Sequence, residues 1–278
     1  MMKRLTAGVA AMALASTLAG CIVISSEGGE RTVVTPANDS AFAPASEAAE
    51  TARLAAIEAV WVAAISDPKR PADEVARDAL RHPAEMLAFA QVRPGDRIAD
   101  IRPGAGYFTL LFSAVAGPNG HVYDFIPNLT AARENARTDA LIAEYSNISR
   151  VNGALDAMTY PEPLDLVFVS QEYHDFHIPR FETDVARMNA AIFAALKPGG
   201  RYVVIDHQAA PGTGINAVET LHRIEGAQLR REVEAAGFVF EDESMAVANP
   251  DDDHSLNVFD EAIRGRTDQF VYRFRKPG

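Results

Sequence analysis

A run of polar, aromatic and titratable side chains follows an apolar stretch near the middle of the chain. Residues 164–170 are mostly apolar, and the next seven residues read Gln-Glu-Tyr-His-Asp-Phe-His. His174 can serve as a general base on a hydroxyl or a thiol, because an unperturbed histidine titrates near pH ~6.5. Asp175 can orient the imidazole, and Tyr173 can offer the face of its ring to a cation. The other interpretation is that these side chains only cap the ends of a strand and a helix.

A glycine-rich turn lies earlier in the chain, where residues 100–109 read Asp-Ile-Arg-Pro-Gly-Ala-Gly-Tyr-Phe-Thr. Gly104 and Gly106 allow the backbone to approach a ligand closely. The turn opens a helix, and a helix N-terminus favours a negative group such as a carboxylate. The pattern is typical of a binding site between a strand and a helix. The same glycines would equally serve a purely structural turn.

Histidine and aspartate residues also have to be considered as metal ligands. Four residues would supply imidazole and carboxylate donors if their two strands were neighbours: His174, His177, Asp206 and His207. The run Asp-Asp-Asp-His at 251–254 lacks the glycine and glutamate of a calcium loop, and we expect it to be a solvated loop. We therefore assign no metal ligands from the sequence, and we expect His222 to lie on the surface.

Strands that alternate with helices must position these residues. Strands are predicted over 97–101, 121–126, 149–151, 164–170, 201–206, 238–247 and 269–275. The middle strands are continuously apolar, which argues for a parallel sheet covered on both faces. The last two have no helix between them, which predicts an antiparallel pair at one edge. Helices are predicted over 46–65, 73–80, 83–89, 107–116, 129–144, 180–196 and 221–236.

A second glycine turn completes a pattern of motifs. Residues 196–206 read Leu-Lys-Pro-Gly-Gly-Arg-Tyr-Val-Val-Ile-Asp, which joins a helix end, a tight turn and a buried strand. With the turn at 100–109 and the apolar strand between them, the order and spacing over residues 92–276 resemble class I S-adenosylmethionine-dependent methyltransferases. The resemblance implies an α/β fold: a Rossmann-like, doubly wound, mostly parallel sheet of about seven strands with an antiparallel edge and an N-terminal helical extension.

Details of the motifs resemble one subgroup of that family, the uncharacterised predicted methyltransferases. The first turn has the form Pro-Gly-x-Gly-Tyr-Phe-Thr, and residues 257–260 read Asn-Val-Phe-Asp. The chain also ends with a Phe-Arg-Lys-Pro pattern.

The resemblance implies S-adenosyl-L-methionine as cofactor. Asp100, Gly104 and Gly106 match the turn that holds its methionyl part in the family. Arg102 stands where the family usually has a third glycine; it can hydrogen-bond a carboxylate or close off the pocket. The family places the end of the fourth strand beside the methyl group, and residues 173–175 lie there.

Two further acids are assigned by the same resemblance. The acid that holds the ribose hydroxyls would fall near Ile126, where none exists, and Asp124 lies two residues earlier on the same face of the strand. Asp156 is placed like the acid that reaches the adenine amine. For both residues the alternative is an exposed carboxylate in a turn.

The N-terminus resembles a bacterial lipoprotein signal. Lys3 and Arg4 precede an apolar run at 5–18, and Leu-Ala-Gly-Cys follows, in which Cys21 is the only cysteine of the chain. We expect cleavage before Cys21 and a lipid on its thiol. Ile22 is typical of sorting to the outer membrane, which would anchor the protein there, facing the periplasm. The alternative is a short core helix followed by a buried cysteine.

These observations divide the chain into four expected parts: a signal peptide at 1–20, a disordered tether at 21–48, N-terminal helices at 49–90 and a methyltransferase-like Rossmann domain at 91–278. The net charge of −12 argues against a nucleic-acid partner, which would require a basic face. We therefore expect a small-molecule substrate, with contact to the membrane through lipidated Cys21.

Two functions remain open at this point. One is a methyltransferase that acts on an unknown small molecule in the cell envelope, which the cluster at 173–175 favours. The other is a methyltransferase-like domain that has lost its activity and serves as a ligand-binding or scaffolding lipoprotein. Arg102, the missing acid near Ile126 and export away from the cytosol, where the cofactor is made, favour the second.

Overall fold

The computed structural model describes residues 43–278, beginning with helix α1 (Ala43–Ile65). The expected signal peptide, Cys21 and most of the expected tether lie outside the described residues. Within the described range, no helix combines the length and the apolar character needed to cross a membrane.

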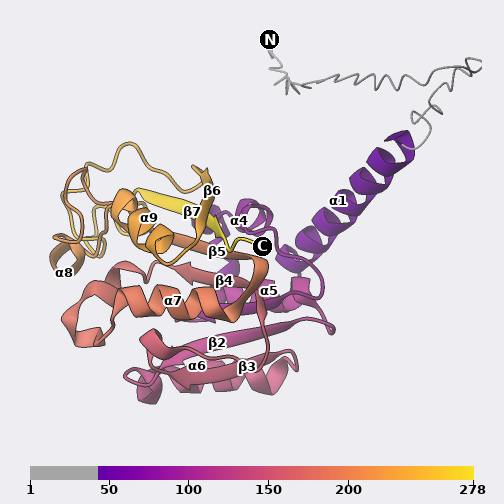
Figure 1. Cartoon of the computed structure of the whole chain (residues 1–278), viewed down its shortest axis with the longest axis horizontal. Helices are drawn as coiled ribbons and strands as arrows, with labels where there is room; N and C mark the ends of the chain where they lie inside the picture. Colours follow the sequence, from indigo (N-terminus) through magenta and orange to yellow (C-terminus); the bar gives the residue numbers. More distant parts are fainter. Residues whose placement is uncertain (1–42) are drawn as a thin grey trace, which may run out of the picture. The chain divides into compact units, whose positions relative to one another are not determined.

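Residues 43–278 form seven strands: β1 (Arg97–Ile101), β2 (His121–Pro127), β3 (Ile148–Gly153), β4 (Leu164–Ser170), β5 (Leu196–His207), β6 (Val239–Ser244) and β7 (Gln269–Arg275). They make one sheet in the order β3-β2-β1-β4-β5-β7-β6 (Figure 1). β1 to β5 run parallel, and β7 pairs antiparallel with both β5 and β6. The sequence-based prediction of a mostly parallel sheet with an antiparallel edge is confirmed.

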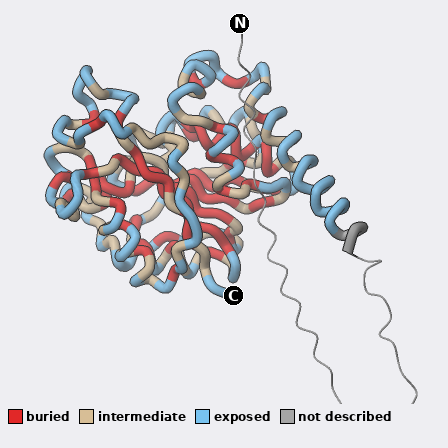
Figure 2. Tube along the Cα trace, turned by 90° about the horizontal axis from the view of Figure 1, so that it is seen from above, coloured by how far each residue is buried: buried red, intermediate tan, exposed pale blue. Residues whose placement is uncertain are grey.

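Besides α1, the longer helices of the described range are α4 (Pro83–Phe89), α5 (Tyr107–Ala116), α6 (Ala131–Glu144), α7 (Val185–Ala195) and α9 (Gly226–Ala235). They cover both faces of the sheet because successive strand residues point to opposite faces. In β5, Val203 and Ile205 pack in one cluster with residues of α4 and α5. Tyr202 and Val204 pack in the other cluster, with residues of α7 and α9. Figure 2 shows the buried residues concentrated along the strands between these layers.

The end of α1 is fixed to the remainder of the described chain. Its Trp61 Nε1 donates to the carbonyl oxygen of Val92 at 2.8 Å, and Ala64 is buried. Two short helices follow, α2 (Ala72–Val75) and α3 (Asp78–Arg81), in place of the single helix expected over 73–80. They precede α4 and bring two arginines toward the carboxyl ends of the strands.

Two predicted helices are divided in the structure. The one expected over 180–196 becomes the 3₁₀ turn η4 (Pro179–Phe181) and α7, because Glu182 has a left-handed φ of 50° and Asp184 caps α7 by accepting from the Arg187 amide. The one expected over 221–236 begins only at Gly226, as α9, and Leu221 instead ends the short helix α8 (Val218–Leu221), because His222 has a φ of 55°. This break frees the His222 side chain from the helix.

Candidate active site

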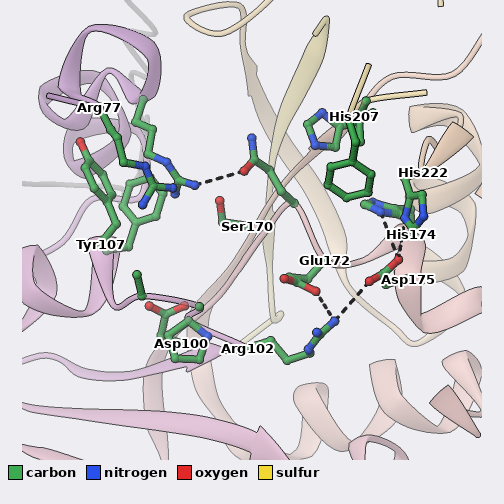
Figure 3. Close-up of a pocket in the computed structure, with 18 residues that line it drawn as sticks. Arg77, Asp100, Arg102, Tyr107, Ser170, Glu172, His174, Asp175, His207 and His222 are labelled. Atoms are coloured by element: carbon green, nitrogen blue, oxygen red, sulfur yellow. Dashed lines mark hydrogen bonds and ion pairs between the residues drawn. The ribbon is translucent and has the colours of Figure 1, made fainter. Parts of the chain in front are cut away.

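A cavity of about 230 Å³ opens at the carboxyl ends of β1 and β4. Ligands bind at this edge of open parallel sheets. The wall on one side comes from the segment of α2 and α3, and the opposite wall comes from the loops after β4, β5 and α8 (Figure 3). The charged, imidazole and amide side chains that line it are Arg77, Arg81, Asp100, Arg102, Gln171, Glu172, His174, Asp175, His207 and His222.

The glycine turn after β1 forms the floor of this cavity. Gly104 has a φ of +62°, and a Cβ added there would meet no atom within 4 Å, so its bare backbone faces open space. Gly106 does not line the cavity. A Cβ on Gly106 would lie 2.6 Å from Leu141 Cδ1 of α6, and its φ is +89°. Gly104 is therefore placed to approach a ligand, whereas Gly106 allows α5 and α6 to pack closely.

Asp100 and Asp124 form a buried pair behind the turn. Each carboxyl group lies 2.9 Å from the Thr109 hydroxyl of α5. Burial and the neighbouring Asp124 raise the pKa of Asp100 to about 8. Burial also raises the pKa of Asp124 to about 7. Because a hydroxyl donates only one hydrogen, the second carboxyl group of the pair must itself hold a proton to bond Thr109.

The position of Asp124 overturns its assignment to the ribose. The residue is fully buried, and its carboxyl group bonds Thr109 of α5 and does not line the cavity. A shift of two residues keeps the side chain on the same face but moves it about 6.6 Å back from the strand end. The sheet edge at Ile126 therefore has no carboxylate from β2.

Arg102 crosses the space beside β2. It has a left-handed φ of 53°, and its side chain is only 8% exposed. The guanidinium forms ion pairs with Glu172, with Glu134 at 3.4 Å and with Asp175 at 3.4 Å. It also lies over the Phe181 ring. Of the two roles considered for this arginine, the geometry supports closing off the pocket on the side of β2 and α6.

His174 is fixed by carboxylates on two sides. It belongs to the 3₁₀ turn η3 (His174–His177), and its Nδ1 donates to Asp206 Oδ1 at 2.7 Å. Its backbone N–H donates to the other oxygen of Asp206, also at 2.7 Å. Its Nε2 lies 3.3 Å from Asp175 Oδ1, which in turn lies 3.1 Å from His222 Nδ1. Asp175 and His222 are both partly buried, so two imidazoles and one carboxylate meet at the cavity wall.

The neighbouring charges set the protonation states of His174 and Asp175. Although burial opposes it, the charge of Asp206 and the hydrogen bonds to Asp175 and Asp206 raise the pKa of His174 to about 10. Burial again opposes the shift at Asp175, but the hydrogen bond from His174 and the nearby cations hold the pKa of that carboxyl at about 2. His174 is thus an imidazolium near neutral pH, which does not suit the expected role of a free general base.

Two predicted site residues lie elsewhere. Tyr173 is fully buried; its hydroxyl donates to Glu232 at 3.0 Å and accepts from Asn189 at 2.8 Å, so its ring cannot face a ligand in the cavity. Asp156 lies in η2 (Leu155–Ala157) and pairs with Arg187 at 3.6 Å, outside the cavity lining. The prediction for Asp156 came from the family resemblance, and that for Tyr173 from the chemistry of its ring.

The four metal ligands considered from the sequence are not brought together. His177 Nε2 lies 3.0 Å from Glu232, and His207 Nδ1 lies 2.8 Å from the hydroxyl of Thr267. Burial lowers the pKa of His207 to about 4, so this imidazole is neutral. Within that set, only His174 and Asp206 bring an imidazole nitrogen and a carboxylate oxygen into contact.

Several cavity residues have no sequence motif. Arg77 and Arg81 come from the N-terminal helices, and Arg81 donates to Gln171 at 3.2 Å across the cavity. His222, expected on the surface, lies in the wall. The strand register explains how Asp206 reaches the site. Ser170 of β4 pairs with Ile205 of β5, so the residues that follow them, Asp206 among them, meet at the same edge of the sheet.

Comparisons with known proteins give partial likenesses. No model of a known protein family matches the chain. Over 119 residues, 41% of the chain, it is 32% identical to the ubiquinone/menaquinone biosynthesis C-methyltransferase UbiE of Pasteurella multocida. Over 125 residues, 44% of the chain, it is 30% identical to a protein-L-isoaspartate O-methyltransferase of Methanothrix thermoacetophila. These matches span 41% and 52% of the two relatives, so the chain covers about half the length of each.

Solved structures extend the likeness to most of the chain. A SAM-dependent methyltransferase from Aquifex aeolicus aligns with a TM-score of 0.51 at 15% identity, covering 72% of this chain and 92% of its own. The YcgJ protein from Bacillus subtilis aligns with a TM-score of 0.50 at 16% identity, covering 72% and 98%. With the strand order, these likenesses define the fold as the Rossmann-like methyltransferase fold. Both relatives are methyltransferases by name, and the Aquifex aeolicus neighbour is a SAM-dependent methyltransferase.

Proposed function

We propose that the protein is an S-adenosylmethionine-dependent methyltransferase that acts on a small-molecule acceptor. The observation that supports this most directly is the bare backbone of Gly104, which faces a cavity at the carboxyl end of β1 in a methyltransferase fold. The cavity has charged groups of both signs, as a zwitterionic ligand requires. Two relatives that match 41% and 44% of this chain are methyltransferases.

The lining residues fit the methionyl end of the cofactor. Arg77 and Arg81 supply cations for its carboxylate, and burial, followed by the charge of Arg77, lowers the pKa of Arg81 to about 10. Glu172 supplies a carboxyl group for an ammonium or hydroxyl group. Burial raises the pKa of Glu172, although Arg102 opposes the rise. Asp100 contributes a carboxyl group behind the glycine turn.

The adenosyl part of the cofactor does not fit into the cavity while Arg102 keeps its ion pairs. A cavity of about 230 Å³ is smaller than the ~300–1,000 Å³ of ordinary ligand pockets. β2 offers no carboxylate at its end, and Asp156 is engaged by Arg187. We infer that Arg102 moves when the whole cofactor binds.

In this proposal the chain acts chiefly by positioning. When bound, the cofactor supplies an electrophilic methyl group. Asp175, held as a carboxylate by His174 and His222, places a negative charge beside the cationic centre, and the buried walls exclude water. Methyl transfer to a well-placed acceptor gains most of its rate from such orientation.

Calorimetry tests the proposal. The protein should bind S-adenosylmethionine or its demethylated product with a Kd in the micromolar range or below, and labelled methyl should then pass to a small-molecule acceptor. Absence of both heat and thermal shift at millimolar cofactor would overturn the proposal. That outcome would favour the ligand-binding lipoprotein, for which the closed position of Arg102 is the supporting observation.

We also propose that a lipid on Cys21 anchors the protein to the membrane, facing the periplasm. The signal-like sequence at 1–21 is the support for this. Labelled palmitate should enter the full-length protein and not its Cys21→Ser variant. Equal labelling of both would contradict the anchor.

A further inference from the structure

Three donor groups converge at the cavity wall opposite Arg81. His174, Asp175 and His222 each offer one ligand atom, and these atoms lie within 4.8 Å of one another. Asp175 Oδ1 lies 3.3 Å from His174 Nε2 and 3.1 Å from His222 Nδ1. Two donors that bind one tetrahedral metal at about 2.0–2.2 Å are about 3.4 Å apart. The spacing around Asp175 therefore already suits a shared cation (Figure 3).

The orientation of His174 is what a metal ligand needs. Its Nδ1–H is taken by the fully buried Asp206, which leaves Nε2 to face Asp175 and His222. Metal-binding histidines commonly donate their second nitrogen to a carboxylate in this manner, which fixes both the tautomer and the ring. Asp206 is itself held by the backbone N–H groups of His174 and His207. The ring is therefore aimed before any ligand binds, and a metal ion that binds Nε2 displaces the proton shared with Asp175 and releases it to solvent.

The carboxylate of Asp175 can serve two partners at once. Its Oδ2 faces Arg102 at 3.4 Å, whereas its Oδ1 faces the two imidazoles. A cation bound at Oδ1 would thus leave the Arg102 ion pair in place. The left-handed backbone of His222 is what directs this third donor to the site.

We propose that His174, Asp175 and His222 bind a divalent transition metal such as Zn²⁺, with Asp206 as the residue that orients His174. Two imidazoles and one carboxylate are a donor set that suits Zn²⁺ or Fe²⁺ better than Mg²⁺, which prefers oxygen ligands. All three ligands line the cavity, so the remaining coordination position faces the ligand space. A metal there would polarise an oxygen of a bound acceptor.

The experiment measures metal binding without cofactor, so its result is independent of methyl transfer. Full-length protein without a histidine tag is stripped with a chelator and titrated with Zn²⁺ or Mg²⁺ by calorimetry, with elemental analysis after dialysis. We expect one Zn²⁺ per chain and no Mg²⁺ binding at the same concentrations. His222→Gln should weaken Zn²⁺ binding at least about tenfold, and so should Asp206→Asn through His174.

His121→Gln is the matched control, because His121 lies at the start of β2 and bonds Ser149. It should bind Zn²⁺ like the wild type. Circular dichroism and thermal unfolding establish that each variant is folded, and His222→Gln serves if Asp206→Asn does not fold. Less than 0.1 equivalent of metal (about a tenth of one site), or Zn²⁺ binding that His222→Gln leaves unchanged, would overturn the site.

Discussion

Asp100 and Asp124 face each other on neighbouring parallel strands, and both carboxyl groups bond the hydroxyl of Thr109. Their pKa values, about 8 and about 7, lie above the usual 3.8 of an aspartate. The folded protein therefore holds protons at neutral pH that the unfolded chain releases. The stability from these protons is complete below pH ~4 and falls as pH rises toward 8.

Asp124→Asn tests this linkage. It removes one ionisable group and lets the remaining Asp100 titrate without an acidic neighbour, so stability should depend less on pH. Between pH 5 and 8 the free energy of unfolding of the wild type should fall relative to the variant, by up to about 1.4 kcal/mol per pH unit and proton. Urea unfolding at both pH values measures this. Asp156→Asn, at a partly buried carboxylate of η2 that is remote from the Asp100–Asp124 pair, is the control and should show the wild-type slope.

Gly104→Val should abolish binding of S-adenosylmethionine. Valine is strained at a φ of +62°, and its side chain would project into the cavity. Gly95→Val is a matched control, because Gly95 has a φ of +87° and lies in the turn before β1, away from the cavity. Calorimetry should find binding lost only in the first variant; equal loss in both would mean that strain, and not the cavity, is responsible.

Arg102→Gly should tighten cofactor binding. The wild type must break the ion pairs with Glu134, Glu172 and Asp175 to admit the adenosyl part, and this cost weakens its apparent affinity. We expect a Kd at least about tenfold lower in the variant, with stability reduced by up to about 3 kcal/mol because three partly buried carboxyl groups lose their cationic partner. Arg102→Lys keeps a cation and serves as control. Weaker binding by Arg102→Gly would instead make the arginine a direct ligand contact.

Tyr173→Phe should lower stability and leave cofactor affinity unchanged. The hydroxyl satisfies Glu232 and the fully buried Asn189, and its loss leaves both short of a partner. We expect a cost of about 1–3 kcal/mol in urea unfolding. Tyr160→Phe is the control, because that hydroxyl has only the Met158 sulfur at 3.6 Å, and it should cost less. A changed Kd for the cofactor in Tyr173→Phe would instead mean that Tyr173 contributes to the cofactor site.

Much of the fold follows from apolar periodicity. The strands at 97–101, 164–170 and 269–275 and the helices at 83–89 and 107–116 have the bounds that the sequence predicts. The divided helices were missed because Glu182 and His222 adopt a left-handed φ that normally indicates glycine.

The candidate site was partly predictable for a related reason. Asp100, Gly104, His174 and Asp175 lie in continuous motifs, and the structure places all four at the cavity. The assignment of Asp124 to the ribose hydroxyls does not agree with the structure. The sequence predicts which face of the strand a side chain lies on, but not whether a helix covers it. The contributions of Arg81 and His222 depend on how distant helices pack, which no local pattern records.

The backbone at Arg102 has the left-handed φ that a glycine adopts at no cost. The loop thus follows a path suited to a glycine while it accommodates a long cationic side chain. A single codon change in either direction could open or fill this end of the pocket without rebuilding the scaffold. In evolutionary terms, the ligand range of this fold can change at one position while the strands beneath it stay the same.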